Sequence, residues 1–206
     1  SSAASDVYKR QTHVPAIIHA WFPGEFGGQA IAEALFGDYN PGGRLAVTFP
    51  KSVGQIPFAF PFKPGSDESS ETSVYGALYP FGHGLSYTTF QYSDLVISPS
   101  KQGVQGNISI SCPIKNIGQR EGDEVVQLYL RDEVSSVTTY TQVLRGFERI
   151  TLKPEASHTV HFELTPQELG IWDKQMNFTV EPGMFKVMIG SSSKDIRLKG
   201  EFEIAQ

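Results

Sequence analysis

Apolar and polar residues alternate along most of the second half of the chain. A period of two with one apolar face is typical of antiparallel strands that are buried on one side only. The alternating segments cover residues 108–114, 126–130, 160–164, 185–189 and 196–204. Turn-forming residues separate them at residues 116–118, 153–154, 181–183 and 191–193. Strands and turns at these intervals predict a two-sheet β-sandwich over residues 90–206.

The first part of the chain follows a mixed pattern. Residues 13–22 are mostly apolar and predict a short buried strand. Residues 29–36 change to helical spacing, and Gly37 stands where a left-handed C-terminal cap is favoured. Residues 45–49 alternate as a second strand, which ends at Pro50. The order strand, helix, strand is that of an α/β unit, so we predict a partial α/β segment before the sandwich.

Composition narrows the classes of partner. The 206 residues carry a formal net charge of −5, which argues against binding to nucleic acid or to anionic membranes. No apolar run approaches the ~18 residues expected of a membrane-spanning helix. Cys112 is the single cysteine, so an internal disulfide is excluded, and its place among alternating apolar residues predicts a buried structural thiol.

Two further segments separate these regions. Residues 62–74 are polar, acidic and rich in serine, which predicts a surface loop. The aromatic residues that follow surround Gly82 and Gly84, which permit close approach of the backbone, so we predict an ordered and largely buried connector. The predicted units are therefore an α/β segment at residues 12–75, the connector at 76–89 and the sandwich at 90–206.

Five phrases, in this order, carry a family resemblance. They are WFPGEFGGQAIAEALFGDYNPGGRLAVTFPKSVGQIP, LYPFGHGLSYTTF, NIGQREGDEVVQLYLRD, LRGFERITLKP and VEPGMFKVMIG. The first resembles the late α/β segment of glycoside hydrolase family 3 β-glucosidases, and the second resembles the connector that follows it there. The others resemble the C-terminal fibronectin type III-like domain of those enzymes, an immunoglobulin-like sandwich.

The resemblance covers residues 14–204, nearly the whole chain. Residues 1–11 (SSAASDVYKRQ) do not resemble the family. We expect them to be a non-native leader, and we expect the native chain to extend upstream of Thr12.

The resemblance implies an enzyme whose catalytic groups lie elsewhere. In this family the nucleophile is an aspartate on an N-terminal TIM barrel, a fold of typically ~250 residues for which this chain is too short. The acid/base is usually a glutamate upstream of the segment that resembles residues 20–50. We therefore assign no catalytic residue and expect the missing barrel to belong to the same chain.

The parent implied by the resemblance is a retaining, exo-acting β-glucosidase. It would remove terminal non-reducing β-D-glucosyl residues from an oligosaccharide or other β-glucoside through a covalent glycosyl-enzyme, with no metal or organic cofactor. A β-xyloside or other exo-glycoside is the alternative substrate. The resemblance also suggests a bacterial protein that is periplasmic or secreted.

Glu25 and Phe26 are the candidate substrate-binding residues. Glu25 follows the first predicted strand, where α/β folds place ligands, and the family commonly has Gln or Glu near this position. The structural alternative is a carboxylate favoured by the dipole of the following helix. The adjacent pair Gly27-Gly28 permits either tight packing or ligand contact, and we favour packing.

Phe26 belongs to a set of aromatic residues that either stack on sugars or bury the seam between segment, connector and sandwich. We favour the seam, because aromatic side chains dominate such interfaces. The set comprises Trp21, Phe22, Phe26, Phe58, Phe60, Phe62, Tyr75, Tyr79, Phe81 and Tyr87.

The histidines do not predict a metal site. The five histidines show neither HxxxH nor HExxH spacing, and His83 is expected at a domain interface. A non-enzymatic sandwich module that binds glycan or a partner protein is the alternative to an enzyme part. The α/β segment disfavours it, because an autonomous module would not need that segment.

Overall fold

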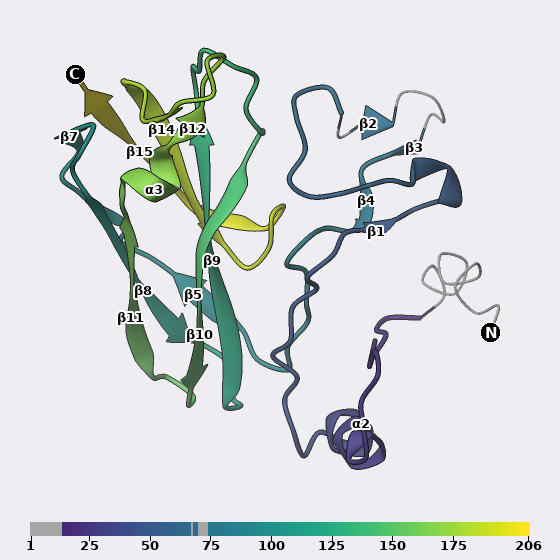
Figure 1. Ribbon diagram of the computed structural model, residues 1–206. Coiled ribbons are helices and arrows are strands. Elements are labelled where there is room, and N and C mark those ends of the chain that lie inside the picture. Colours follow the sequence, from purple (N-terminus) through teal and green to yellow (C-terminus); the bar gives the residue numbers. More distant parts are fainter. Residues whose placement is uncertain (1–13, 67, 70–73) are drawn as a thin grey trace.

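The computed structural model describes residues 14–66, 68–69 and 74–206 (Figure 1). Residues 90–206 form a β-sandwich, and the preceding residues run along its side with one longer helix and several short strands. The predicted leader, residues 1–11, lies outside the described residues. Within the described part of the chain, no helix has the length and apolar character needed to traverse a bilayer.

The sandwich consists of two sheets, as predicted. The strands of the larger sheet, in spatial order, are β10 (Val143–Leu152), β9 (Gly122–Asp132), β14 (Gly183–Gly190), β15 (Ile196–Ala205) and β7 (Lys101–Gly103). Those of the smaller sheet are β11 (Ser157–Leu164), β8 (Ile108–Asn116) and β5 (Phe90–Tyr92), with β6 (Val96–Ser98) also pairing with β8. The β15–β7 pair is parallel and the other pairs in these sheets are antiparallel.

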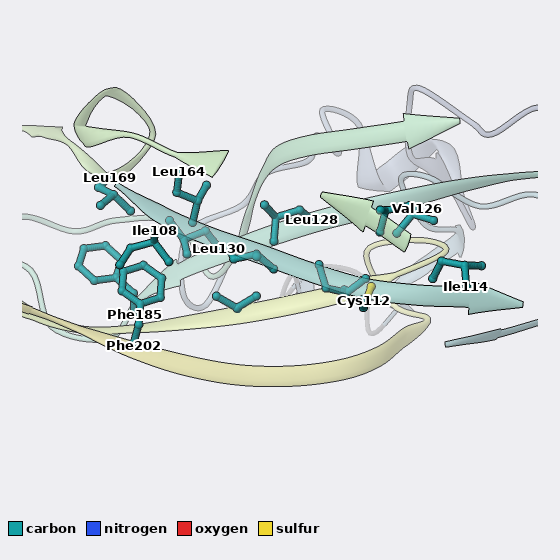
Figure 2. Packing of buried hydrophobic residues seen from close by; sticks show 14 of the residues in the cluster. Ile108, Cys112, Ile114, Val126, Leu128, Leu130, Leu164, Leu169, Phe185 and Phe202 are labelled. Atoms are coloured by element: carbon teal, nitrogen blue, oxygen red, sulfur yellow. The ribbon is translucent and has the colours of Figure 1, made fainter. Parts of the chain in front are cut away.

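The core lies between these sheets (Figure 2). Ile110 on β8 and Val160 on β11 are both fully buried, which follows from the predicted alternation. The rings of Phe185 and Phe202 stack with centroids 5.4 Å apart. Burial stabilises each large apolar side chain by about 1.5–3 kcal/mol. Cys112 is buried in this core, as predicted, and burial raises the pKa of its thiol to about 11.

The predicted helix is present as α2 (Gly27–Phe36), and Gly37 ends it in the left-handed conformation at φ 84°. Its predicted apolar face is only partly covered. Ala34 is buried, whereas Leu35 is 64% exposed and Phe36 is 84% exposed. Half of α2 is therefore buried or partly buried, and residues 28–30, 35 and 36 are exposed.

The strand predicted at residues 13–22 is wrong for the part that is described. Residues 14–22 form no strand, and Ile17 and Ile18 are 42% and 43% exposed. His13 lies outside the described residues. A strand needs a hydrogen-bonded neighbour, and no described segment lies in register beside these residues. The apolar pattern indicates burial, but it does not provide the partner strand.

The second predicted strand is shorter than residues 45–49. Only β1 (Phe49–Pro50) forms, and it pairs with β4 (Ala77–Tyr79). The partner is the connector, and the register shifts between Phe49 and Pro50, which interrupts the ladder. The two segments meet again where Leu45 bonds with the backbone of Gly82 and His83. The remaining short elements before the sandwich are η2 (Val53–Gln55), β2 (Glu68–Ser69) and β3 (Val74–Tyr75).

A small hairpin follows β11. The helix α3 (Pro166–Leu169) is capped by Thr165, whose backbone N–H donates to Glu168 Oε2 at 2.8 Å. Leu169 is buried in the sandwich core. The strands β12 (Ile171–Trp172) and β13 (Phe178–Thr179) then form the hairpin, which is fixed to the sandwich at its base.

Candidate functional site

The connector meets the sandwich by close backbone approach at Gly82. Its φ is +80°, and a Cβ atom there would lie 2.0 Å from Oε1 of Gln127. The Gly82 N–H donates to the Leu45 carbonyl at 2.8 Å, and Gln127 Nε2 donates to the Gly82 carbonyl at 3.2 Å. Only glycine satisfies both the conformation and the space, as the sequence predicts.

The connector is less buried than predicted. Gly82 is buried and Phe81 is partly buried, but Leu85 is 56% exposed and Tyr87 is 48% exposed. The physical reason is that only one side of the connector meets the sandwich and the 37–45 turn.

The side chain of Asn40 forms hydrogen bonds with two other segments of the chain. Its Oδ1 accepts a hydrogen bond from the Tyr87 N–H at 2.7 Å, and its Nδ2 donates to the Glu121 carbonyl at 3.0 Å. The turn after α2, the connector and the loop before β9 therefore meet at one amide side chain.

Arg44 and Glu124 form a buried ion pair across the seam. Arg44 Nη2 lies 2.6 Å from Glu124 Oε1, and the two side chains are only 8% and 5% exposed. Burial raises the pKa of the Glu124 carboxyl, and the Arg44 charge opposes that rise. Such a pair fixes geometry, because removing one partner leaves an uncompensated buried charge.

Aromatic rings fill the remainder of the seam, which supports the predicted packing role for part of the set. Phe60 stacks on Phe81 with centroids 4.6 Å apart and meets Tyr129 edge-on at 5.7 Å. Beside them is an open cavity of about 230 Å³, lined by Phe58, Phe60, Phe62, Phe81 and Lys194 among others.

His83 lies at this interface, as expected. Its ring stacks on Tyr79 with centroids 5.0 Å apart, and its carbonyl accepts the Leu45 N–H at 2.8 Å. Burial and the nearby Arg44 charge lower the pKa of His83, while Asp195 opposes this effect. The imidazole is thus held neutral at neutral pH.

Glu25 and Phe26 lie away from the seam, on the turn that leads into α2. Phe26 is the N-cap residue and is 70% exposed, and Glu25 is also exposed. Neither lines the cavity beside Phe60. Gly27 faces the Pro23 ring of the preceding turn, where an added Cβ would lie 2.6 Å from Pro23 Cβ, and an added Cβ at Gly28 would meet no described atom within 4 Å. Within the described residues the two glycines therefore do not pack the helix on a sheet, which corrects the packing role that we favoured.

Comparison with protein families divides the chain into two parts, in the order that the sequence predicts. Residues 2–87 match the glycosyl hydrolase family 3 C-terminal domain, and residues 124–193 match the fibronectin type III-like domain. The chain belongs to glycoside hydrolase family 3.

Individual family 3 relatives align with almost the whole chain. The periplasmic β-glucosidase of Salmonella typhimurium is 43% identical over 95% of this chain and 27% of its own length. A β-xylosidase of Formosa agariphila is 42% identical over 91% of this chain and 26% of its own length. The solved structure of a β-glucosidase from Erythrobacter marinus has a TM-score of 0.89 and 39% identity, over 95% of this chain and 26% of that one. The chain thus spans about a quarter of the length of these relatives.

Three exposed phenylalanines lie on α2 or just before it, and we call these rings, together with Glu25, the α2 face. Phe22 is 100% exposed, Phe36 is 84% exposed and Phe26 is 70% exposed. Large apolar surfaces of this kind mark interaction sites. The candidate residues Glu25 and Phe26 belong to this face.

The part of the chain that the structure describes offers no cluster of metal-binding side chains. Its residues 14–66, 68–69 and 74–206 hold no group of three or more His, Cys, Asp or Glu side chains suited to a metal ion. The residues that organise the seam, Asn40, Arg44 and Glu124, were missed by sequence reasoning. All three lie within the phrases that resemble the family, but no local sequence pattern shows that Arg44 pairs with Glu124, which is 80 positions away.

Proposed function

We propose that this chain is the C-terminal part of a retaining, exo-acting β-glycosidase and has a structural role in that enzyme. The observation that supports it most is the similarity to the Salmonella β-glucosidase, which extends over 95% of the chain at 43% identity. The proposed catalytic residues lie on the part of the enzyme that this chain does not contain, including a TIM barrel.

In this proposal the α2 face is covered by the rest of the α/β domain. The sandwich has a closed core of its own, whereas Phe22 and Phe36 have none. Covering each such ring would stabilise the complete enzyme by about 1.5–3 kcal/mol.

The proposed substrate is a terminal β-D-glucosyl residue, with a β-xyloside as the second candidate. The second candidate has its own support, because two relatives named β-xylosidase are 40–42% identical to this chain. Specificity residues would lie mainly in the barrel, so the choice between the two sugars rests with that domain.

A chimera tests the proposal. The matching C-terminal region of the Salmonella enzyme is replaced by residues 12–206 of this chain, and hydrolysis of aryl β-glucoside and aryl β-xyloside is measured. We expect activity from the chimera, but none from this chain alone or from the Salmonella enzyme lacking the region. Turnover by the isolated chain above a boiled control, surviving Glu25→Gln, would contradict the proposal, as would an inactive but folded chimera. Activity is also expected to survive EDTA, because no metal is proposed.

Glu25 and Phe26 are proposed to contact substrate or the neighbouring domain in the complete enzyme. For a substrate contact, Glu25→Gln in the chimera raises KM and leaves the melting temperature unchanged. Unchanged KM with a lower melting temperature would assign Glu25 to the domain interface instead.

The proposed location is the periplasm or the exterior of a bacterium. It is supported by the name of the Salmonella relative. Fractionation of cells that produce the full-length protein tests it, and activity confined to the cytoplasmic fraction would contradict it.

A further inference from the structure

A second aromatic site lies on the sandwich itself, at the β12–β13 hairpin. Trp172 and Phe178 are opposite each other in the strand register, with ring centroids 5.5 Å apart and an interplanar angle of 62°. Trp172 is 59% exposed and Phe178 is 47% exposed, and Met176 at the tip is 72% exposed. These three side chains, which we call the hairpin platform, have no role in the core or the seam.

The hairpin platform is held rigidly. The Phe178 ring covers Gly170, where an added Cβ would lie 2.3 Å from the ring. Asp173 Oδ1 accepts the N–H groups of Gln175 and Asn177, both at 2.8 Å. An exposed ring that is already fixed binds a ligand with little loss of conformational entropy.

The proposed continuation of the α/β domain is a poor candidate for covering the hairpin platform, because α2 and β12 lie apart. In Figure 1, α3, which directly precedes the hairpin, lies at the upper left of the sandwich, whereas α2 lies at the lower right. The α2 face is where the proposed α/β domain continues. Figure 1 shows β12, the first strand of the hairpin, near the upper end of the sandwich and away from α2.

A second copy of the chain is also a poor candidate. Aromatic side chains bury roughly 150–250 Å² each, and a stable dimer needs about 800 Å² on each partner. Two rings and a methionine provide too little area. The size of the platform suits a narrow ligand.

The chemistry of the platform fits a neutral polysaccharide. A sugar ring has an apolar C–H face and a rim of hydroxyl groups. The ring of Trp172 offers a flat apolar surface, and the exposed amides of Gln175 and Asn177 offer donors and acceptors beside it. Binding sites commonly combine aromatic surface with a few polar groups in this way.

We propose that the hairpin platform binds the polysaccharide chain, a β-linked glucan or xylan, on which the enzyme acts. The choice of glycan rests on the proposed function. The sandwich would then hold the polymer near the enzyme while the barrel removes its terminal sugars, and the hairpin platform would take no part in the chemical step.

The test measures depletion of the purified chain from solution by insoluble cellulose and by insoluble xylan. Trp172→Ala is compared with Trp21→Ala, a matched control because both tryptophans are 59% exposed. We expect the wild-type chain to bind at least one polymer, Trp172→Ala to weaken the affinity about tenfold, and Trp21→Ala to have no effect. Trp172→Phe should restore part of the binding, and circular dichroism confirms that each variant is folded.

Two results would overturn the proposal. One is a wild-type chain that binds neither polymer, and the other is equal loss of binding in Trp21→Ala and Trp172→Ala. The assay needs no catalysis, so it is independent of the proposed function.

Discussion

At the scale of single residues, the seam depends on a few buried polar contacts. The Arg44–Glu124 ion pair joins the turn after α2 to the strand β9 at 2.6 Å. Asn40 and Gln127 add side-chain hydrogen bonds to backbone groups on both sides. These contacts fix where the α/β segment sits on the sandwich, and the stacked rings of Phe60 and Phe81 pack beside them.

Replacing Arg44 tests this account. Arg44→Met leaves Glu124 buried without its cation, so we expect a loss of about 3–5 kcal/mol in the free energy of unfolding. The control is Lys101→Met, which removes an ion pair with side chains 61% and 43% exposed, and which should cost about 0–1 kcal/mol. Urea unfolding measures both, and equal losses would show that the buried pair has no special weight.

His83 makes the seam sensitive to pH. Its pKa lies below the usual 6.5 because of burial and Arg44, so the folded state favours the neutral ring. Above 6.5 both folded and unfolded chains hold a neutral imidazole. As pH falls below that value the unfolded chain binds the proton more readily, and stability is lost.

The matching variant is His83→Phe, which keeps the stack on Tyr79 but has no proton to bind. The urea midpoint of the wild-type chain should drop between about pH 7.5 and about pH 5.5, and that of the variant should drop less. The charged groups nearest His83 are Arg44 and Asp195, which are the same in both proteins. A drop of the same size in both would exclude His83 as its source.

At the scale of elements, the sandwich has a hydrophobic core of its own and the α/β segment does not. The core cluster is drawn entirely from residues 90–206, whereas the described residues between 14 and 89 contain one α-helix of ten residues and a few very short strands. A segment with so little sheet cannot bury its apolar faces.

We therefore expect residues 90–206 to fold alone and residues 12–75 to remain unfolded. Circular dichroism and urea melts of the two separate polypeptides provide the measurement. The sandwich should give β-type spectra and one cooperative transition. A cooperative transition in residues 12–75 would refute the second half of this prediction.

Sequence reasoning succeeded where structure follows from local pattern. The alternation in β8, β11 and β14 predicted the sandwich, and the spacing of residues 29–36 with Gly37 predicted α2. It failed at residues 14–22, because an apolar run indicates burial without showing which segment provides the partner strand. The ion pair and the hairpin platform were not found, because pairing across 80 residues and surface exposure leave no periodic signal.

At the scale of the whole molecule, the chain has one closed domain and one open face. The sandwich core is sealed, while Phe22 and Phe36 of the α2 face are 100% and 84% exposed. The chain spans about a quarter of the length of its family 3 relatives. In our account the remaining α/β domain covers the α2 face, and the barrel beyond it carries out the hydrolysis.

The most direct test of this account compares Phe22→Asp in the isolated chain and in the Salmonella chimera, with Phe22→Leu as the control that keeps an apolar contact. Because Phe22 touches solvent on all sides in this chain, the account predicts an unchanged melting temperature for the isolated Phe22→Asp variant. In the chimera the same substitution buries a charge, so the melting temperature should fall by several degrees and aryl β-glucoside hydrolysis should fall with it. A chimera that keeps both its melting temperature and its activity would show that the α2 face is not covered, and the central claim would be wrong.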